Sequence, residues 1–148
     1  MSKVCWITGG GSGIGAELAK ILSKDKYTVY ISGRTKSKLS NIARYNKSII
    51  PVHGDVSSLK DCKKIVNTIH KKFKKINLVV MNAATYSPGS METLNVDEIR
   101  KVVDINLMGV INCLSSVISK MKKNKEGHLM IVSSPAGYRG LPGAGIYG

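Results

Sequence analysis

Acidic side chains are scarce in this sequence: 9 Asp and Glu stand against 23 Lys and Arg, and the formal net charge is +14. Such an excess of positive charge occurs in proteins that bind nucleic acids or anionic membranes. Here the basic residues are spread along the chain in short groups, and aromatic residues make up only 5% of the total. We therefore interpret the lysines as a solvated surface and expect no nucleic-acid or membrane partner. A basic nucleic-acid-binding protein is the alternative.

The sequence also has few cysteines and no long hydrophobic run. Cys5, Cys62 and Cys113 are odd in number and far apart, and no CxxC pair occurs, so neither a disulfide framework nor a zinc site is indicated. The three histidines do not have metal-ligand spacing. No apolar run approaches the roughly 18 residues needed to span a bilayer, and the N-terminus passes directly into a strand-like run without room for a signal peptide. We expect a cytoplasmic protein without a bound metal.

Strand-like and helix-like segments alternate along the chain, which is typical of a parallel sheet covered by helices on both faces. The expected fold is α/β, a Rossmann-type doubly wound parallel sheet with strand order 3-2-1-4-5, in a single domain over residues 1–148. Pro51 lies inside the third strand and indicates an edge position, and Asn95 is the expected N-cap of the last helix. The predicted strands are 3–8, 27–33, 48–53, 76–82 and 128–133, and the predicted helices are 13–25, 36–45, 58–74 and 96–122. A loop is predicted from the fourth strand to Leu94, and a Gly/Pro-rich loop after the fifth strand. The apolar stripe of the first helix is Ile14, Leu18, Ile21 and Leu22, and that of the last helix is Ile99, Val102, Val103, Val110, Cys113, Leu114, Val117 and Met121.

Five glycines are concentrated in the stretch "TGGGSGIG" from Thr8 to Gly15, at the joint between the first strand and the first helix. Glycine at such a joint lets the backbone approach a ligand closely, and the free N–H groups of the helix N-terminus suit a pyrophosphate. Gly11-x-Gly13-x-x-Ala16 satisfies the general dinucleotide pattern in the required strand–turn–helix context. We therefore expect residues 1–148 to form a dinucleotide-binding domain. The alternative is a tight turn that binds no ligand.

The fuller spacing Thr8-Gly9-x-x-x-Gly13-x-Gly15 resembles the short-chain dehydrogenase/reductase family, and further motifs of that family follow in order along the whole chain. One of them, Asn-Ala-Gly in the family, departs here at Ala84, which would hold the backbone slightly further from the cofactor. The resemblance implies an oxidoreductase that transfers a hydride between a nicotinamide cofactor and a carbonyl or alcohol substrate. The cofactor-binding residues implied by the glycine motif and by the motifs after the third and fourth strands are Gly9, Gly11, Ser12, Gly13, Ile14, Gly15, Asp55, Val56, Asn82, Ala83 and Ala84.

The end of the second strand indicates which nicotinamide cofactor is used. A carboxylate about 20 residues beyond the glycines would bond the ribose 2′-hydroxyl of NAD, but no Asp or Glu occurs between Asp25 and Asp55. Arg34 follows the strand instead, with Lys36 and Lys38 nearby, and the arginine fork suits a phosphate. We predict NADP in preference to NAD. Alternatively, Arg34 only terminates the strand.

The family resemblance also implies three catalytic residues. Tyr147 would be the general acid/base, Ser134 thirteen positions earlier would hold the substrate oxygen, and Asn106 would kink the long helix and support a proton relay. Asn106 falls on an apolar helical stripe, so a structural asparagine bonded to a neighbouring backbone is the alternative. Tyr138, a competing tyrosine, is interpreted as a loop residue.

The family's lysine would occupy position 151, whereas the sequence ends at Gly148. We expect the sequence to be part of a longer enzyme, apparently truncated after the catalytic tyrosine; a fragment without activity is the alternative. The resemblance further suggests a homodimer or homotetramer. A catalytically silent NADP-binding or redox-sensing module is the rival function.

Overall fold

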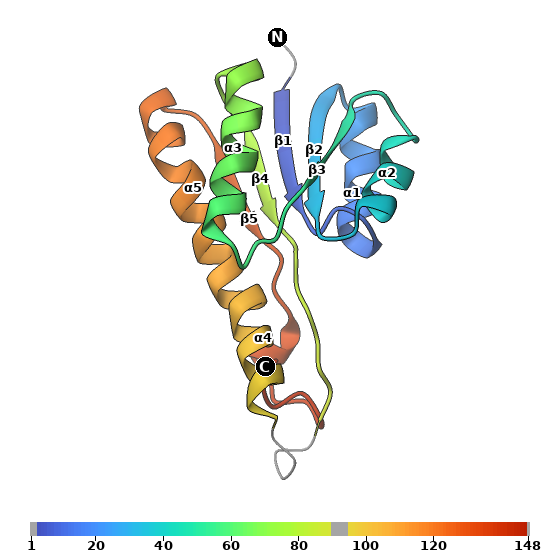
Figure 1. Ribbon diagram of the computed structural model, residues 1–148, viewed down its shortest axis with the longest axis vertical. Helices are drawn as coiled ribbons and strands as arrows, with labels where there is room; N and C mark the ends of the chain where they lie inside the picture. Colours follow the sequence, from blue (N-terminus) through green and yellow to red (C-terminus); the bar gives the residue numbers. More distant parts are fainter. Residues whose placement is uncertain (1–2, 90–94, 148) are drawn as a thin grey trace.

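The computed structural model describes residues 3–89 and 95–147 and contains a parallel sheet with strand order β3-β2-β1-β4-β5 (Figure 1). All four neighbouring strand pairs are parallel. The predicted fold class and strand order are therefore confirmed, including the edge position of the strand that contains Pro51. The strands are β1 (Lys3–Thr8), β2 (Tyr27–Gly33), β3 (Ile49–His53), β4 (Leu78–Met81) and β5 (His128–Ile131).

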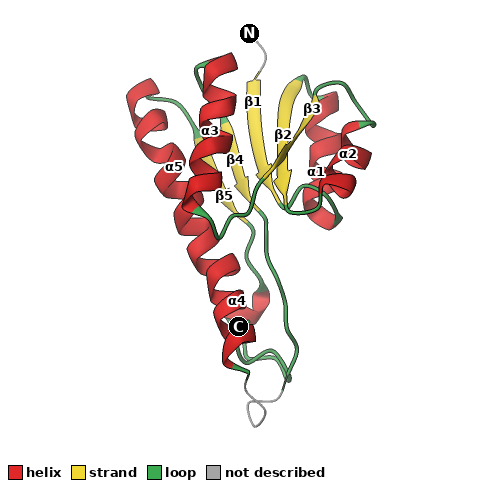
Figure 2. Cartoon of the chain, in the orientation of Figure 1, coloured by secondary structure: helices red, strands yellow, loops and turns green. Residues whose placement is uncertain are grey.

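Helices cover both faces of the sheet, α1 and α2 on one side and α3 and α5 on the other (Figure 2). The alternation of side chains along β1 divides the core between these faces. Cys5 and Ile7 pack with α1 and α2, whereas Val4 and Trp6 pack with α3 and α5. The helices are α1 (Gly13–Lys24), α2 (Lys36–Ala43), α3 (Leu59–Phe73), α4 (Val96–Val103) and α5 (Gly109–Asn124).

The predicted apolar stripe of α1 is confirmed in part. Leu18 and Leu22 are half-buried and pack against the core, whereas Ile14 and Ile21 are 67% and 58% exposed. The fully buried positions of α1 are small residues, Gly15, Ala16, Ala19 and Ser23. This helix begins directly against the glycine turn and the sheet, so its fully buried positions have short side chains.

The predicted helix over 96–122 extends from Val96 to Asn124 and is interrupted by a π-helical turn at Asp104–Met108, between α4 and α5. Asn95 caps it as predicted, because its Oδ1 accepts hydrogen bonds from the N–H groups of Asp97 (3.0 Å) and Glu98 (3.3 Å). The predicted apolar stripe is buried or half-buried along most of its length. It is wrong at Val103, which is 41% exposed.

Beyond the carboxyl ends of the strands, the molecule continues as an elongated extension (Figure 1). It consists of α4 together with the segments that follow β4 and β5. These two segments meet where the Gly89 N–H donates to the Gly143 carbonyl at 3.1 Å. β5 is shorter than predicted and ends at Ile131, and the predicted Gly/Pro-rich loop after it includes a short 3-10 helix, Pro135–Gly137. Part of the loop predicted to reach Leu94 lies outside the described residues.

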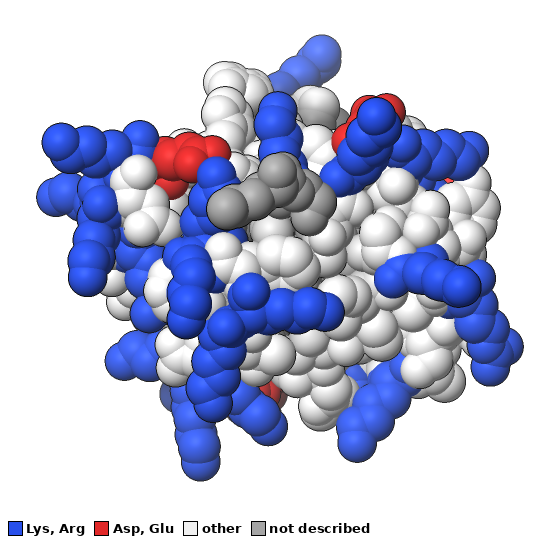
Figure 3. Space-filling model, turned by 90° about the horizontal axis from the view of Figure 1, so that it is seen from above, with Lys and Arg blue, Asp and Glu red and all other residues white. Residues whose placement is uncertain are grey.

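Figure 3 shows the face at the amino ends of the strands, which is the top of the view in Figure 1. Lys and Arg side chains are distributed around this face with few acidic neighbours. One helical segment within the described residues, Val96–Asn124, is long and apolar enough to cross a bilayer by length and composition alone. That test is also passed by core helices, and this segment contributes Ile105, Cys113, Val117 and Met121 to the core against α3 and the sheet.

Candidate active site

The glycine turn between β1 and α1 has a backbone that other residues would not adopt. Gly9 and Gly13 have φ angles of +66° and +55°, in the left-handed region. A Cβ on Gly9 would also lie 2.9 Å from the Cα of Ala83 on the neighbouring strand end. The turn therefore brings two backbone segments into contact at the carboxyl edge of the sheet.

Thr8 and Asn82 fix these two segments together. The N–H groups of Asn82 and Ala83 both donate to Thr8 Oγ1 at 3.0 Å. In return, Asn82 Nδ2 donates to the carbonyl of Thr8 at 3.0 Å and to that of Gly9 at 3.4 Å. This reciprocal arrangement satisfies polar groups that the glycine turn would otherwise leave unpaired, and it makes the wall beside the turn rigid.

Gly15 is the residue of the motif with the least space. A Cβ at this position would lie 2.5 Å from Asn82 Nδ2 and 2.7 Å from the carbonyl oxygen of Gly9. We expect Gly15→Val to lower the free energy of unfolding by roughly 1–3 kcal/mol, the usual range for overpacking. Urea unfolding followed by the fluorescence of Trp6, the only tryptophan and fully buried, measures this.

The matched control is Gly137→Val, because nothing lies within 4 Å of a Cβ placed on Gly137. The control should change the midpoint of unfolding little. Equal destabilisation by both substitutions would show that the tight fit at Gly15 is not what requires glycine there.

A pocket of about 340 Å³ opens beside the glycine turn, at the carboxyl ends of β1 to β4. Ligands of doubly wound sheets bind in this crevice. Nine of the residues predicted to bind a cofactor line it: Gly9, Gly11, Ser12, Arg34, Asp55, Val56, Asn82, Ala83 and Ala84. The remaining three, Gly13, Ile14 and Gly15, follow in the first turn of α1 and are not part of the lining.

The start of α1 is available to an anion. Ser12 occupies the N-cap with an extended backbone (φ −163°), and its side chain makes no capping hydrogen bond. The first turn of α1 contains no acidic residue. The first N–H groups of a helix have no partner within the helix and carry a partial positive charge. Ser12 also lines the pocket, so this positive end lies at its border.

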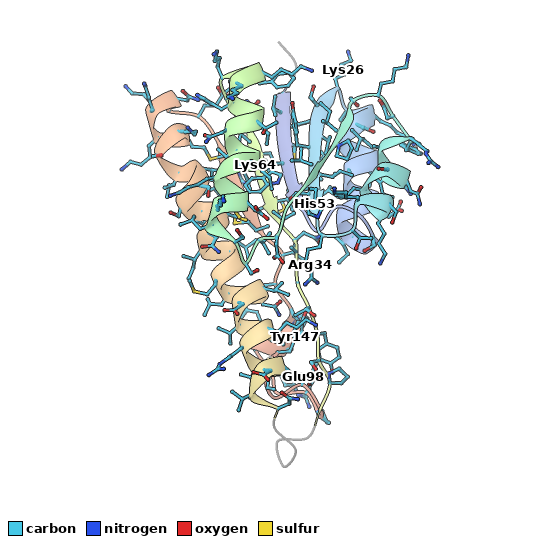
Figure 4. All side chains as sticks on the ribbon, viewed as in Figure 1. Lys26, Arg34, His53, Lys64, Glu98 and Tyr147 are labelled. Carbon is cyan, nitrogen blue, oxygen red and sulfur yellow. The ribbon has the colours of Figure 1, made fainter. Side chains whose placement is uncertain are left out.

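Two basic side chains line the pocket at the end of β2. Arg34 and Lys38 are both in the lining, and the backbone of Arg34 is held in place by His53, whose Nε2 lies 3.0 Å from the Arg34 carbonyl oxygen (Figure 4). Lys36, the other lysine considered from the sequence, is not in the lining. Helix α2 lies close to the glycine turn: a Cβ placed on Gly11 would lie 3.2 Å from the Cβ of Lys38.

Asp55 is the acidic residue of the lining. Its Oδ1 accepts hydrogen bonds from the N–H (2.9 Å) and the Oγ (2.8 Å) of Ser57. The Asp55 N–H in turn donates to Asp61 Oδ2 at 3.0 Å. These local contacts fix the turn between β3 and α3 and orient the adjoining Val56 into the pocket wall.

Sequence reasoning did not identify every residue of the lining. The unidentified residues are Gly33, Thr35, Leu39, Gly54 and Ile105. Gly33, Thr35 and Gly54 lie beside predicted site residues, and the position of the strand ends was the available signal. Ile105 had no such signal, because it comes from the π-helical turn.

Ser134 and Tyr147 lie on the extension, Asn106 lies in the π-helical turn between α4 and α5, and none of the three is in the pocket lining. Asn106 pairs with the backbone of Thr85 in both directions: the Thr85 N–H donates to Oδ1 at 2.8 Å, and Nδ2 donates to the Thr85 carbonyl at 2.9 Å. Ser134 Oγ accepts a hydrogen bond from the Ala136 N–H at 3.2 Å. Across residues 3–89 and 95–147, no hydrogen bond joins Asn106, Ser134 and Tyr147 to one another.

Tyr147 packs edge-on against the ring of Tyr86, with ring centroids 5.0 Å apart. Figure 4 shows Tyr147 on the extension, with Arg34 at the edge of the sheet on one side of it and Glu98 on the other. Tyr138 is 96% exposed, in agreement with its interpretation as a loop residue. Within the part of the chain that the structure describes, no three His, Cys, Asp or Glu side chains are grouped so that they could hold a metal ion.

Comparison with known proteins gives a consistent result. A sequence model described as short chain dehydrogenase matches residues 3–148. An uncharacterized oxidoreductase of Listeria monocytogenes is 31% identical over 151 residues, which cover 99% of this chain and 61% of the relative. The chain therefore spans less than two thirds of the length of that relative.

Solved structures are similar as well. The structure of ElxO with NADP bound has a TM-score of 0.93 and 28% identity, covering 99% of this chain and 61% of that one. A 3-ketoacyl-(acyl-carrier-protein) reductase from Brucella melitensis complexed with NADH has a TM-score of 0.91 and 28% identity, covering 98% and 62%. Among the similar structures, both nicotinamide cofactors therefore occur.

Proposed function

This chain belongs to the short-chain dehydrogenase family, and we propose that it binds NADP(H) and transfers a hydride between the nicotinamide and a small carbonyl or alcohol substrate. The observation that carries the proposal is the pocket at the carboxyl edge, which combines a glycine wall with two cationic side chains. Both features suit a phosphorylated dinucleotide. The cofactor would supply or accept the hydride.

The residues of the pocket fit the separate parts of such a cofactor. The pyrophosphate would lie against Gly9, Gly11 and Ser12. The two glycines have no side chain, and the N-terminus of α1 at Ser12 has no side-chain cap. The adenine would be bordered by Asp55 and Val56. A ribose of the cofactor would lie against the segment Asn82–Ala84. Gly13, Ile14 and Gly15 would contribute through the backbone of the first turn of α1.

The preference for NADP is supported by the charges at the end of β2. Arg34 and Lys38 line this side of the pocket, and the acidic residue of the lining, Asp55, follows β3 instead. A 2′-phosphate would pair with the arginine fork, whereas the ribose hydroxyl of NAD would find no carboxylate at this strand end. The NADH complex of the Brucella reductase keeps NAD as the alternative.

For the reaction, we assign Tyr147 as the general acid/base at the substrate oxygen and Ser134 as the donor that orients this oxygen. Asn106 would support the proton relay, and its paired bonds to Thr85 would hold the loop after Ala84 in place. A homodimer or homotetramer, located in the cytoplasm, is the expected state of the protein. The three catalytic roles and the oligomeric state are carried over from the family resemblance, and the cytoplasmic location from the cysteine content of the sequence.

A catalytically silent NADP-binding or redox-sensing module is the second candidate. One observation favours it: both the oxygen and the nitrogen of the Asn106 side-chain amide are hydrogen-bonded to the Thr85 backbone, and within the described residues the three catalytic candidates are not hydrogen-bonded to one another. In this case the nucleotide would bind without turnover.

The test combines titration with turnover. Isothermal titration calorimetry with NADPH and NADH measures both dissociation constants, and we expect NADPH to bind more tightly. Oxidation of NADPH in the presence of a panel of aldehydes and ketones, followed by its absorbance, separates the enzyme from the silent module. Absence of binding by either nucleotide to the folded protein would refute both candidates.

A further inference from the structure

Two buried thiols face each other between α3 and α5. Cys62 on α3 and Cys113 on α5 are 51 positions apart in the sequence, and their Sγ atoms are 3.9 Å apart. Their exposed fractions are 0% and 1%, and both cysteines are free. Cys5, the third cysteine, belongs to the core cluster on the opposite face of the sheet. This pair was not predictable from the sequence, because residues so far apart meet only through the fold.

The distance between the thiols suits bond formation. A disulfide has an S–S length of about 2.05 Å, so the two sulfur atoms need to approach by about 2 Å. Cys62 and Cys113 lie in the same core cluster, in two helices that pack side by side (Figure 1). A change in side-chain rotation together with a small shift of either helix would supply this displacement.

The thiols are connected directly to the wall of the nucleotide pocket through Val56. Cys62 Sγ donates a hydrogen bond to the Val56 carbonyl at 3.6 Å, and Nδ2 of Asn112, the neighbour of Cys113, donates to the same carbonyl at 2.9 Å. The Val56 side chain packs against Gly109 of α5, where a Cβ would lie 2.7 Å from Val56 Cγ2. Movement of either cysteine therefore changes the contacts that hold Val56 in the pocket lining.

We propose that Cys62 and Cys113 are a site of oxidative modification, at which a peroxide closes a disulfide that weakens nucleotide binding. In the first step, the Cys62 sulfur attacks one peroxide oxygen, the O–O bond breaks, and a sulfenic acid and one water form. In the second step, the Cys113 sulfur attacks the Cys62 sulfur, the S–O bond breaks, and the oxygen leaves as water with the thiol proton. Overall, two thiols lose two electrons and two protons, and hydrogen peroxide is reduced to two waters.

The environment of the two thiols assigns their order of reaction. The hydrogen bond with Cys113 lowers the pKa of the Cys62 thiol, against the opposing effects of burial and of the carboxylates of Asp61 and Asp55. The hydrogen bond with Cys62 and burial raise the pKa of the Cys113 thiol. The thiolate is the reactive form of cysteine, so Cys62 attacks first and Cys113 resolves the sulfenic acid.

Disulfide formation and NADPH binding should affect each other equally, an inference that rests on the proposed function. If the disulfide weakens NADPH binding by a given factor, bound NADPH opposes disulfide formation by the same factor. Coupling between two sites is typically about 5- to 150-fold. We expect oxidation of the full chain to raise the dissociation constant of NADPH by at least about fivefold, and dithiothreitol to restore it.

The test begins with treatment of the folded chain with hydrogen peroxide. We expect the number of titratable thiols to fall from three to one and the intact mass to decrease by two hydrogens. Peptide mapping without reductant should find Cys62 joined to Cys113. Cys62→Ala and Cys113→Ala should each abolish the intramolecular disulfide, whereas the matched control Cys5→Ala should retain it. Cooperative unfolding reported by Trp6 fluorescence verifies that each variant folds.

Other outcomes overturn the proposal. Three remaining thiols, a disulfide that includes Cys5, or oxidation that stops at sulfinic acid would refute the modification site. A disulfide between Cys62 and Cys113 that leaves the NADPH dissociation constant unchanged would refute the regulation. If the reduced protein binds no nucleotide, the proposed function fails separately, and amide hydrogen exchange of residues 54–58 then decides: unchanged exchange after oxidation contradicts the coupling to Val56.

Discussion

Tyr147→Phe is expected to lower kcat for carbonyl reduction by about 10²- to 10⁴-fold, the range that general acid/base groups contribute. The substitution removes the hydroxyl that would donate the proton to the substrate oxygen. It retains the aromatic ring, so the edge-on contact with Tyr86 is preserved. The NADPH dissociation constant should stay unchanged, because Tyr147 does not line the pocket. Steady-state kinetics and calorimetric titration on the same preparation measure both quantities.

The matched control is Tyr138→Phe, which alters the other tyrosine near Ser134 and should leave kcat unchanged because Tyr138 is almost completely exposed. A large loss of kcat in the Tyr138 variant, with Tyr147→Phe remaining active, would transfer the acid/base role to Tyr138. Equal activity of both variants and the parent protein would exclude any tyrosine of this segment from the chemistry.

Arg34→Ala is expected to weaken NADPH binding by roughly 10- to 150-fold, which corresponds to the 1.5–3 kcal/mol of hydrogen bonds to a charged group. The affinity for NADH should change little, because NADH has no 2′-phosphate for Arg34 to contact. The dissociation constant of NADH divided by that of NADPH therefore falls towards unity. Calorimetric titration with each nucleotide at one fixed salt concentration measures the ratio, and raising the salt concentration should reduce it in the parent protein.

Arg44→Ala is the control for Arg34→Ala, since Arg44 is exposed just beyond α2 and does not line the pocket. It removes the same charge and should leave both dissociation constants unchanged. If Arg34→Ala weakens NADPH and NADH equally, Arg34 supports the pocket as a whole and does not select the cofactor.

Much of the fold was predictable because its signals are local. The buried run of β1, the glycine turn and the cap at Asn95 all depend on residues adjacent in sequence, and each was found where predicted. Parallel strand–helix units placed the site at the carboxyl ends of the strands. The nine lining residues themselves were named from the motifs of the family and from the basic residue after the second strand.

The features that the sequence did not reveal depend on contacts between distant segments. Ile14 and Ile21 of α1 are exposed because small residues occupy the fully buried positions of this helix, close to the glycine turn. Asn112 gave no signal, although it is buried and donates to the carbonyls of Val56 and Ser57. Only the packing of α5 against the turn after β3 creates that requirement.

The π-helical turn at Asp104–Met108 has a consequence for how the sequence tolerates change. A wide turn contains more residues than an α-helical one, so deleting one residue there would allow regular winding to resume. The wide turn absorbs its additional residue, so α4 and α5 would keep nearly the same relative rotation after such a deletion. The backbone of the turn itself would change, and Asn106 would lose its pairing with Thr85. Shortening this turn would therefore leave the two helices aligned and release the segment after β4 from the helix.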